Sequence, residues 1–161
     1  MLVGKRLADA ESCPLMMNGA PLEFVSDYKY LGVHLHTDEV LKFTVVDTLR
    51  AFHRAANSIL CSRVKPNKRI LMKLLYANCV PIITYSCAVR EFSAADMYRC
   101  HVAVNNAIRR IYSFAVWQSI RDIRIENGYK SIYEIFALAK AKFLNLAPTS
   151  LNRVVSRLAT F

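Results

Sequence analysis

The hydrophobic period of this chain changes once, near residue 38. Residues 28–35 alternate, so that Leu31, Val33 and Leu35 fall on one face of a strand. Beyond residue 38 the apolar residues recur every three or four positions, which is the spacing of one helix stripe. The first stripe consists of Val45, Leu49, Phe52, Ala56 and Ile59. The sequence therefore predicts a mainly α protein with a small antiparallel β element at its N-terminal end.

A hairpin turn is expected within the β region. Asn18-Gly19 separates the short apolar runs 15–17 and 22–25, and this dipeptide tolerates the positive φ angles of a two-residue turn. Residues 28–35 then supply a third strand. We assign residues 1–37 to a β hairpin unit and residues 38–161 to a helical domain, with Asp38 as the cap of its first helix.

Proline and capping signals divide the helical region. The first helix should end before Pro66, and the next should begin there and continue until Pro81 bends or ends it. Its expected buried side consists of Ile70, Leu71, Leu74 and Leu75. Three later helix starts place a serine three residues before a carboxylate, the spacing of a capping box: Ser93 with Asp96, Ser119 with Asp122, and Ser131 with Glu134.

The positive charge is concentrated in the helical region. The net charge is +10, but residues 1–48 contain four Lys/Arg and seven Asp/Glu, whereas residues 49–161 contain eighteen and five. Such a basic helical region favours a polyanionic partner, because phosphate contacts by Lys and Arg release condensed counterions. An anionic membrane surface is the competing partner.

Cysteine usage and hydropathy indicate the compartment. The five cysteines are widely spaced, no CxxC occurs, and we expect buried, reduced thiols. The most apolar run, residues 74–89, is interrupted by polar residues and is shorter than the roughly 20 residues that span a bilayer. With no secretory leader recognised, we expect an intracellular protein of the nucleus or cytoplasm, with no transmembrane segment and no membrane partner.

Several motifs occur in an order that is typical of one polymerase family. The series begins with the hairpin-like stretch PLMMNGAPLEFV at residues 14–25 and with YKYLGV at residues 28–33. It continues with two apolar segments, residues 74–76 and 81–85, and with the helix AVNNAIRRI at residues 103–111. It ends with WQSI at residues 117–120 and IFALAK at residues 135–140. This series resembles the primer grip, thumb and following helices of non-LTR (LINE-like) retrotransposon reverse transcriptases.

The resemblance implies a function and a missing part. The parent enzyme is an RNA-directed DNA polymerase that uses Mg²⁺, held by palm carboxylates in a Tyr-x-Asp-Asp turn, and this chain contains no adjacent Asp pair. We therefore expect a fragment that binds template-primer RNA and DNA, would pack on the missing palm domain, has no cofactor of its own and is inactive alone. The alternative is a basic helical interaction module that binds an acidic protein partner.

The same resemblance places the β residues of the expected binding site. Tyr30, Leu31 and Gly32 would lie at the hairpin that supports the 3′ end of the primer. A glycine there would let the backbone approach the sugar-phosphate chain closely, because it has no Cβ atom. The alternative is that Gly32 only marks a bend in the strand.

Helical residues supply the remaining candidates. Arg50 and Arg54 lie one turn apart, opposite the first apolar stripe, and could follow a phosphate backbone or form a solvated face. A denser basic cluster surrounds the next turn: Arg63, Lys65, Lys68, Arg69 and Lys73. A later helix contributes amide and guanidinium donors suited to sugar and phosphate contacts: Asn105, Asn106, Arg109 and Arg110.

Two restrictions apply to these candidates. Arg109 and Arg110 diverge by about 100° around a helix, so we expect them to face different surfaces, with one of them tied to a nearby acidic residue. His34 and His36 share one face of a strand, but no third ligand follows at a suitable distance, so we predict no metal site. We predict no catalytic residues.

Overall fold

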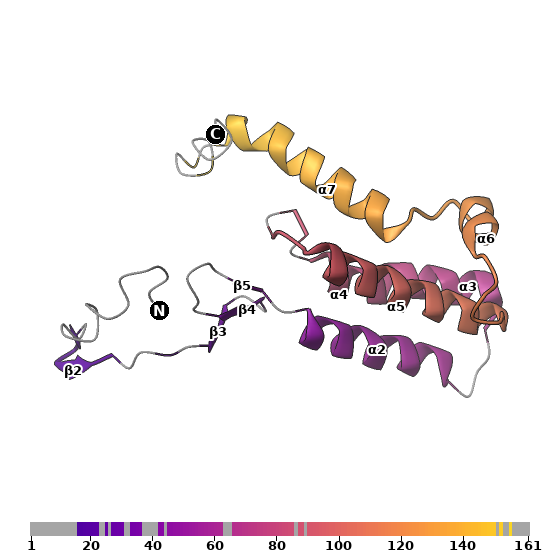
Figure 1. Ribbon diagram of the computed structural model, residues 1–161, viewed down its shortest axis with the longest axis horizontal. Coiled ribbons are helices and arrows are strands. Elements are labelled where there is room, and N and C mark those ends of the chain that lie inside the picture. The colour runs from indigo at the N-terminus through magenta and orange to yellow at the C-terminus, as the bar shows by residue number, and fades with distance from the viewer. Residues whose placement is uncertain are drawn as a thin grey trace. The chain divides into compact units, whose positions relative to one another are not determined.

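The computed structural model describes residues 16–22, 25, 27–30, 33–36, 42–43, 45–62, 66–85, 87–88, 90–150, 152 and 155. The chain divides into two compact units, Met1–Val45 and Val46–Phe161. The first contains short strands and the second contains helices (Figure 1). The prediction of a mainly α protein with a small N-terminal antiparallel β element is confirmed.

The first hairpin forms at the expected turn. Strands β1 (Met16–Met17) and β2 (Ala20–Pro21) pair antiparallel, with Met17 opposite Ala20. The two residues between them have positive φ angles, 52° at Asn18 and 81° at Gly19. Asparagine and glycine adopt this left-handed conformation at lower cost than other residues, so the turn follows directly from its sequence.

The expected third strand is instead two strands. β3 (Asp27–Tyr30) and β4 (Val33–His36) pair antiparallel with Tyr30 opposite Val33, and β5 (Lys42–Phe43) pairs with β4. A link of only two residues, one of them glycine, joins β3 to β4, and the period-two alternation passes through it unbroken. The alternation alone therefore could not distinguish one long strand from a hairpin.

Helix α2 (Val46–Leu60) begins later than expected, because strand β5 occupies residues that were assigned to it. Asp38, the expected cap, lies outside the described residues. The predicted stripe is otherwise confirmed: Phe52 and Ala56 are buried, and the other stripe residues within the helix pack against the same core.

One helical path continues through Pro81. It comprises α3 (Lys68–Leu74), the π-helical segment η1 (Leu75–Cys79) and α4 (Val80–Thr84). The Val80 N–H donates to the Leu75 carbonyl, five residues back. Proline has no N–H and crowds the carbonyl four residues earlier, so a widened turn before Pro81 lets the helix continue.

The buried face of this path differs from the predicted one. Met72 and Leu75 are buried, together with Cys79 and Ile83 further along, whereas Ile70 is 49% exposed. The prediction for Leu75 is confirmed and that for Ile70 is wrong. In a cluster of consecutive apolar residues the period of 3.6 admits more than one stripe, and tertiary packing selects one of them.

Helix α5 (Ala94–Tyr112) is the central helix of the unit and contacts α2, α3 and α7. Ser93 caps it, since its hydroxyl accepts from the Asp96 N–H at 3.1 Å, as expected. It ends at Ser113, which adopts the left-handed conformation with φ 59°. Its buried residues form the middle of the core: Cys100, Ala103, Val104, Ala107, Ile108 and Ile111.

The other two expected capping boxes have different outcomes. Helix α7 (Ile132–Leu146) starts with a complete reciprocal box between Ser131 and Glu134. Helix α6 (Arg121–Glu126) instead has Ile120 at its N-cap position, and the Ser119 hydroxyl accepts from the Arg121 N–H. The prediction of a capping box at Ser119 is therefore wrong. The apolar Ile120 takes the cap position because its side chain is buried.

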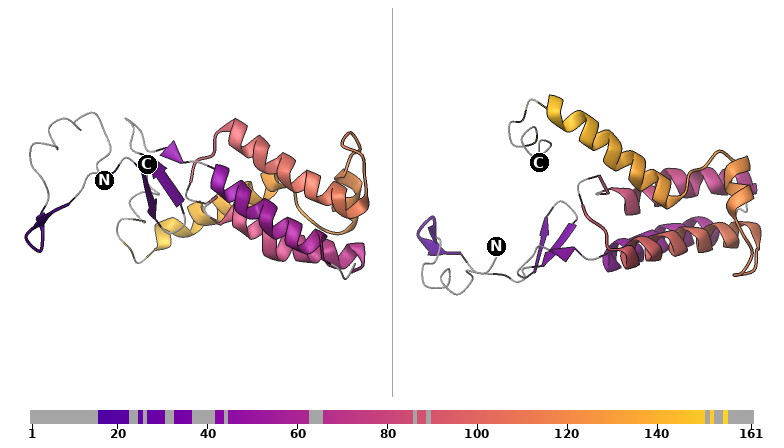
Figure 2. Two further views of the ribbon diagram at one scale, coloured as in Figure 1. Left: turned by 90° about the horizontal axis from the view of Figure 1, so that it is seen from below. Right: turned by 45° about the horizontal axis from the view of Figure 1, so that its top comes forward.

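The helix termini gather at one end of the unit. The end of α2, the start of α3, the end of α5 and all of α6 lie together in each view (Figures 1 and 2). The Lys68 ammonium, on α3, lies 5.5 Å from the centre of the Tyr112 ring, on α5. The 3₁₀ turn η2 (Ala147–Thr149) follows α7. Among the described residues, no helix has the length and apolar character needed to cross a membrane.

Candidate nucleic-acid interface

Two of the candidate arginines lie on the exposed face of α2. Arg50 and Arg54 are one turn apart, on the side of the helix away from the buried Phe52 and Ala56. The Arg50 side chain is 69% exposed, and its Nη1 lies 2.9 Å from the Asp47 carboxylate. A surface pair of this kind is worth little and is screened by salt, so Arg50 stays available to a stronger anion.

A third arginine extends this face from another helix. The Nη1 of Arg110, on α5, donates to the Oδ1 of Asn57, on α2, over 2.6 Å. Asn57 follows Arg54 by three residues and therefore lies next along the same face. We call Arg50, Arg54 and Arg110 the α2–α5 basic row.

The candidates on α3 lie at the gathered end of the unit. Lys68, Arg69 and Lys73 are exposed, and Lys68 is held over the Tyr112 ring. Arg63 and Lys65 lie outside the described residues. Between residues 48 and 90 the sequence contains eight Lys/Arg and no Asp or Glu, so within this stretch no carboxylate offsets the positive charge.

The other α5 candidates make bonds within the unit. The Nδ2 of Asn105 lies 2.8 Å from the Nε2 of His101, one turn earlier. Arg109 donates from Nη1 to the Asn106 side-chain oxygen at 3.0 Å and from Nε to the Gln118 carbonyl at 3.1 Å. Arg109 and Asn105 are only partly exposed, Asn106 accepts from Arg109, and the bonds of Arg109 fix the segment after α5. Arg110 is exposed, so it alone of these residues is included in the basic row.

The two consecutive arginines diverge as predicted. Arg109 turns toward the segment after α5, whereas Arg110 turns toward α2. Among the described residues, the hydrogen bonds of both arginines go to neutral oxygens, of Gln118, Asn106 and Asn57, and not to the expected acidic partner. These neutral acceptors do not offset the positive charge of either guanidinium.

The β candidates can be located only in part. Tyr30 ends β3 and pairs with Val33 across the hairpin. Leu31 and Gly32 lie outside the described residues. We therefore build the interface from the helical unit alone.

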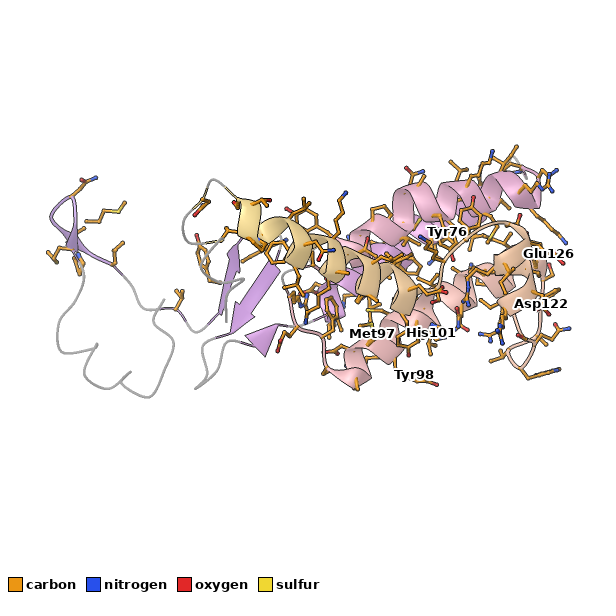
Figure 3. The ribbon with its side chains drawn as sticks, turned by 90° about the horizontal axis from the view of Figure 1, so that it is seen from above. Tyr76, Met97, Tyr98, His101, Asp122 and Glu126 are labelled. Carbon is orange, nitrogen blue, oxygen red and sulfur yellow. The ribbon has the colours of Figure 1, made fainter. Side chains whose placement is uncertain are left out.

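A second group of polar and aromatic side chains comes from η1, α5 and the segment between α6 and α7; Figure 3 labels Tyr76 of η1 and His101 of α5. The Tyr76 ring stacks on the Tyr129 ring at 4.1 Å, its hydroxyl donates to the Lys130 carbonyl, and burial raises its pKa to about 12. Burial also lowers the pKa of His101, with further lowering from Arg124 and Arg109. We assign these groups to the packing of the unit, because their contacts are internal.

Three buried cysteines have thiols that are not activated. Burial raises the pKa of the Cys79, Cys87 and Cys100 thiols, the last to about 11, which disfavours the reactive thiolate. Cys61 is exposed, and Cys13 lies outside the described residues.

The resemblance implies an Mg²⁺ ion that a palm domain would hold. Such an ion is held by carboxylates, and the part of the chain that the structure describes contains no group of three residues able to hold a metal. His34 and His36 belong to the same strand, β4. We derive no metal-dependent step for this chain.

Two residues of the site were not anticipated. Asn57 connects Arg110 to the face of α2, and Gln118 receives Arg109. The only sequence signal for Asn57 is its spacing of three from Arg54, which places a polar side chain next along the same face. Gln118 has no such signal, because its role depends on how the segment after α5 folds back.

Comparison of the chain with models of protein families, with curated proteins and with solved structures found no match.

Proposed function

We propose that the helical unit binds the sugar-phosphate backbone of an RNA–DNA template-primer through the α2–α5 basic row. In this proposal the chain corresponds to the region after the catalytic palm of a non-LTR retrotransposon reverse transcriptase, with the hairpin of β3 and β4 in the place of the primer grip. It binds nucleic acid and does not extend it, because the polymerase carboxylates and their Mg²⁺ belong to the palm.

The bond between Arg110 and Asn57 is the observation that carries this proposal. It joins two helices distant in sequence and brings the guanidinium of Arg110 to Asn57, which lies next along the face of α2 that carries Arg50 and Arg54. From Arg50 to Asn57 the helix rises about 10 Å at 1.5 Å per residue. That length covers about three base-pair steps along a duplex axis, at about 3.4 Å per step.

The lysine and arginine residues of α3 add to the same surface charge. Lys68 is held against the last turn of α5, so it lies at the end of the unit that Arg110 also occupies. Exposed cations on a firmly packed helical scaffold can contact phosphates with little loss of backbone freedom. Such contacts position a nucleic acid and do not read its bases.

The proposal is tested by the salt dependence of binding to an RNA–DNA duplex, measured by fluorescence anisotropy. Three phosphate contacts require a log-log slope of affinity against salt of about −2.7 or steeper. A flat response contradicts phosphate binding.

If an acidic peptide binds as tightly as the duplex at the same salt concentration, the interaction module for an acidic protein is the better function. Primer extension by the purified chain with Mg²⁺ and nucleotides contradicts the assignment of the chemistry to the palm.

A further inference from the structure

The most exposed large apolar side chains of the described helical unit lie together on the segment between α5 and α6. Trp117 is 86% exposed and Val116 is 76% exposed. Single exposed apolar residues are ordinary on protein surfaces. Here, however, the residue is the only tryptophan of the chain. It also lies on a segment whose backbone is held in place.

Hydrogen bonds fix this segment on both sides of the tryptophan. The Phe114 N–H donates to the Arg109 carbonyl at 2.8 Å, which closes the end of α5. The Ala115 N–H donates to the Gln118 side-chain oxygen at 2.7 Å, and the Gln118 N–H donates to the Ala115 carbonyl at 3.1 Å. Arg109 holds the Gln118 carbonyl from α5. A partner that contacts Trp117 therefore meets an ordered segment and loses little affinity to ordering it.

The charges around this segment favour an anionic partner. The α6 helix is balanced, because Asp122 and Glu126 offset Arg121 and Arg124; the two carboxylates lie on α6 in Figure 3. The excess of positive charge comes from α5, in which the arginines Arg99, Arg109 and Arg110 outnumber the single carboxylate, Asp96. Trp117 lies on the segment that follows α5, whose last turn carries Arg110, the last residue of the basic row.

We propose that Trp117 stacks on an unpaired base at the end of the duplex whose backbone lies along the α2–α5 basic row. This inference rests on the proposed function and adds to it a contact with a base. Every nucleobase presents a flat π face, so such a contact tolerates any sequence. A base stacked on an aromatic side chain raises affinity by roughly 5- to 100-fold.

Tryptophan fluorescence tests this inference directly, because Trp117 is the only tryptophan. The probe is an RNA–DNA duplex with an unpaired template overhang, and binding is followed in parallel by the anisotropy of a dye on the duplex. We expect saturable quenching of Trp117 emission with the same midpoint as the anisotropy change. We also expect W117A to lose roughly 5- to 100-fold in affinity for the overhang duplex, and W117F to retain most of it.

Controls separate stacking from charge and from loss of an aromatic residue in general. Tyr98, which is 62% exposed near the start of α5 and away from α6 in Figure 3, supplies the matched variant Y98A, expected to bind as the wild type does. W117A should leave the salt slope unchanged, because it removes no phosphate contact. Circular dichroism should show that both variants are folded, since both side chains are exposed.

The contrary outcomes are distinct. Anisotropy that reports binding while Trp117 emission stays constant and W117A binds normally overturns the stacking contact and leaves the proposed function standing. No anisotropy change overturns both. A blue shift of emission with phosphatidylcholine–phosphatidylserine vesicles, without quenching by the duplex, overturns stacking in favour of a membrane contact.

Discussion

The guanidinium of Arg110 on α5 donates to the side-chain oxygen of Asn57 on α2 over 2.6 Å, between residues 53 positions apart in the chain. Without this bond the arginine could adopt many rotamers over the surface. With it, the charge of Arg110 is held in line with Arg50 and Arg54. The bond thereby links the packing of the two helices to the surface that we propose binds nucleic acid.

The first prediction concerns this bond. In N57A the Arg110 guanidinium loses its hydrogen-bond acceptor and becomes mobile. A duplex must then fix the position of this side chain when it binds, which costs affinity. We expect duplex affinity to fall by roughly 3- to 10-fold, which corresponds to the net free energy of about one hydrogen bond. Anisotropy titration at fixed salt measures this loss of duplex affinity.

S58A is the control, because Ser58 is the neighbouring exposed residue and its hydroxyl donates only to the Ala55 carbonyl of its own helix. Equal losses in the two variants would show that the Asn57 bond does not position Arg110.

Two serines with the same sequence signature should differ in their effect on stability. Ser131 forms a complete capping box, whereas Ser119 lies outside the cap position of α6. We expect S131A to lower the free energy of unfolding by about 1 kcal/mol, and S119A to lower it by about 0.5 kcal/mol or less. Urea unfolding of both variants measures the difference. A larger loss in S119A would contradict the described start of α6.

Two apolar residues of α3, Met72 and Ile70, should also differ in how much their truncation lowers stability. Met72 is completely buried and Ile70 is 49% exposed. Truncation of a buried methionine leaves a cavity, so we expect M72A to cost about 2–5 kcal/mol. For I70A we expect a cost of about 1 kcal/mol or less, because only part of its apolar area leaves water. A larger loss in I70A than in M72A would mean that the predicted stripe, and not the described one, faces the core.

His101 should make the stability depend on pH. Burial and two nearby arginines, Arg124 and Arg109, lower its pKa in the folded protein. The unfolded chain therefore takes up the proton first. The contribution of His101 is complete above the unfolded pKa of about 6.5 and is lost as the pH falls through that value toward the folded pKa.

The measurement is urea unfolding at pH 7.5 and at pH 5.5. We expect the wild type to lose more stability between the two than H101Q, in which the glutamine oxygen can still accept from Asn105. H53Q is the control, since His53 is exposed on α2. The Nδ1 atom of His101 is buried and has no hydrogen-bond partner among the described residues, so a charge there is poorly compensated. Identical pH dependence in wild type and H101Q would exclude this role.

Local signals predicted those elements whose sequence permits only one structure. Asn18-Gly19 and Ser131 with Glu134 are such cases, because backbone conformation and capping depend on adjacent residues. Periodicity failed where two structures share one pattern. It could not reveal the hairpin link between β3 and β4, nor decide between Ile70 and Met72.

The candidate interface depended on information that a helical pattern does not contain. Spacing correctly separated Arg109 from Arg110, because consecutive helix residues diverge. It could not tell which of them would stay on the surface, since that depends on Asn57 and Gln118, which are brought close only by the fold. The exposure of Trp117 also escaped the sequence reading, because an aromatic residue after a helix is as compatible with the core as with the surface.

The most direct test compares two variants that each lose three exposed positive charges. One is R50Q/R54Q/R110Q, which removes the α2–α5 basic row, and the other is R99Q/K140Q/K142Q, which removes exposed cations of α5 and α7 outside it. Duplex affinity is measured by anisotropy over a range of salt concentrations. We predict that the salt slope of the row variant falls by about 2–3, at about 0.9 per phosphate contact, while the control keeps the wild-type slope. Equal losses of slope in the two variants would contradict a localised phosphate-binding row.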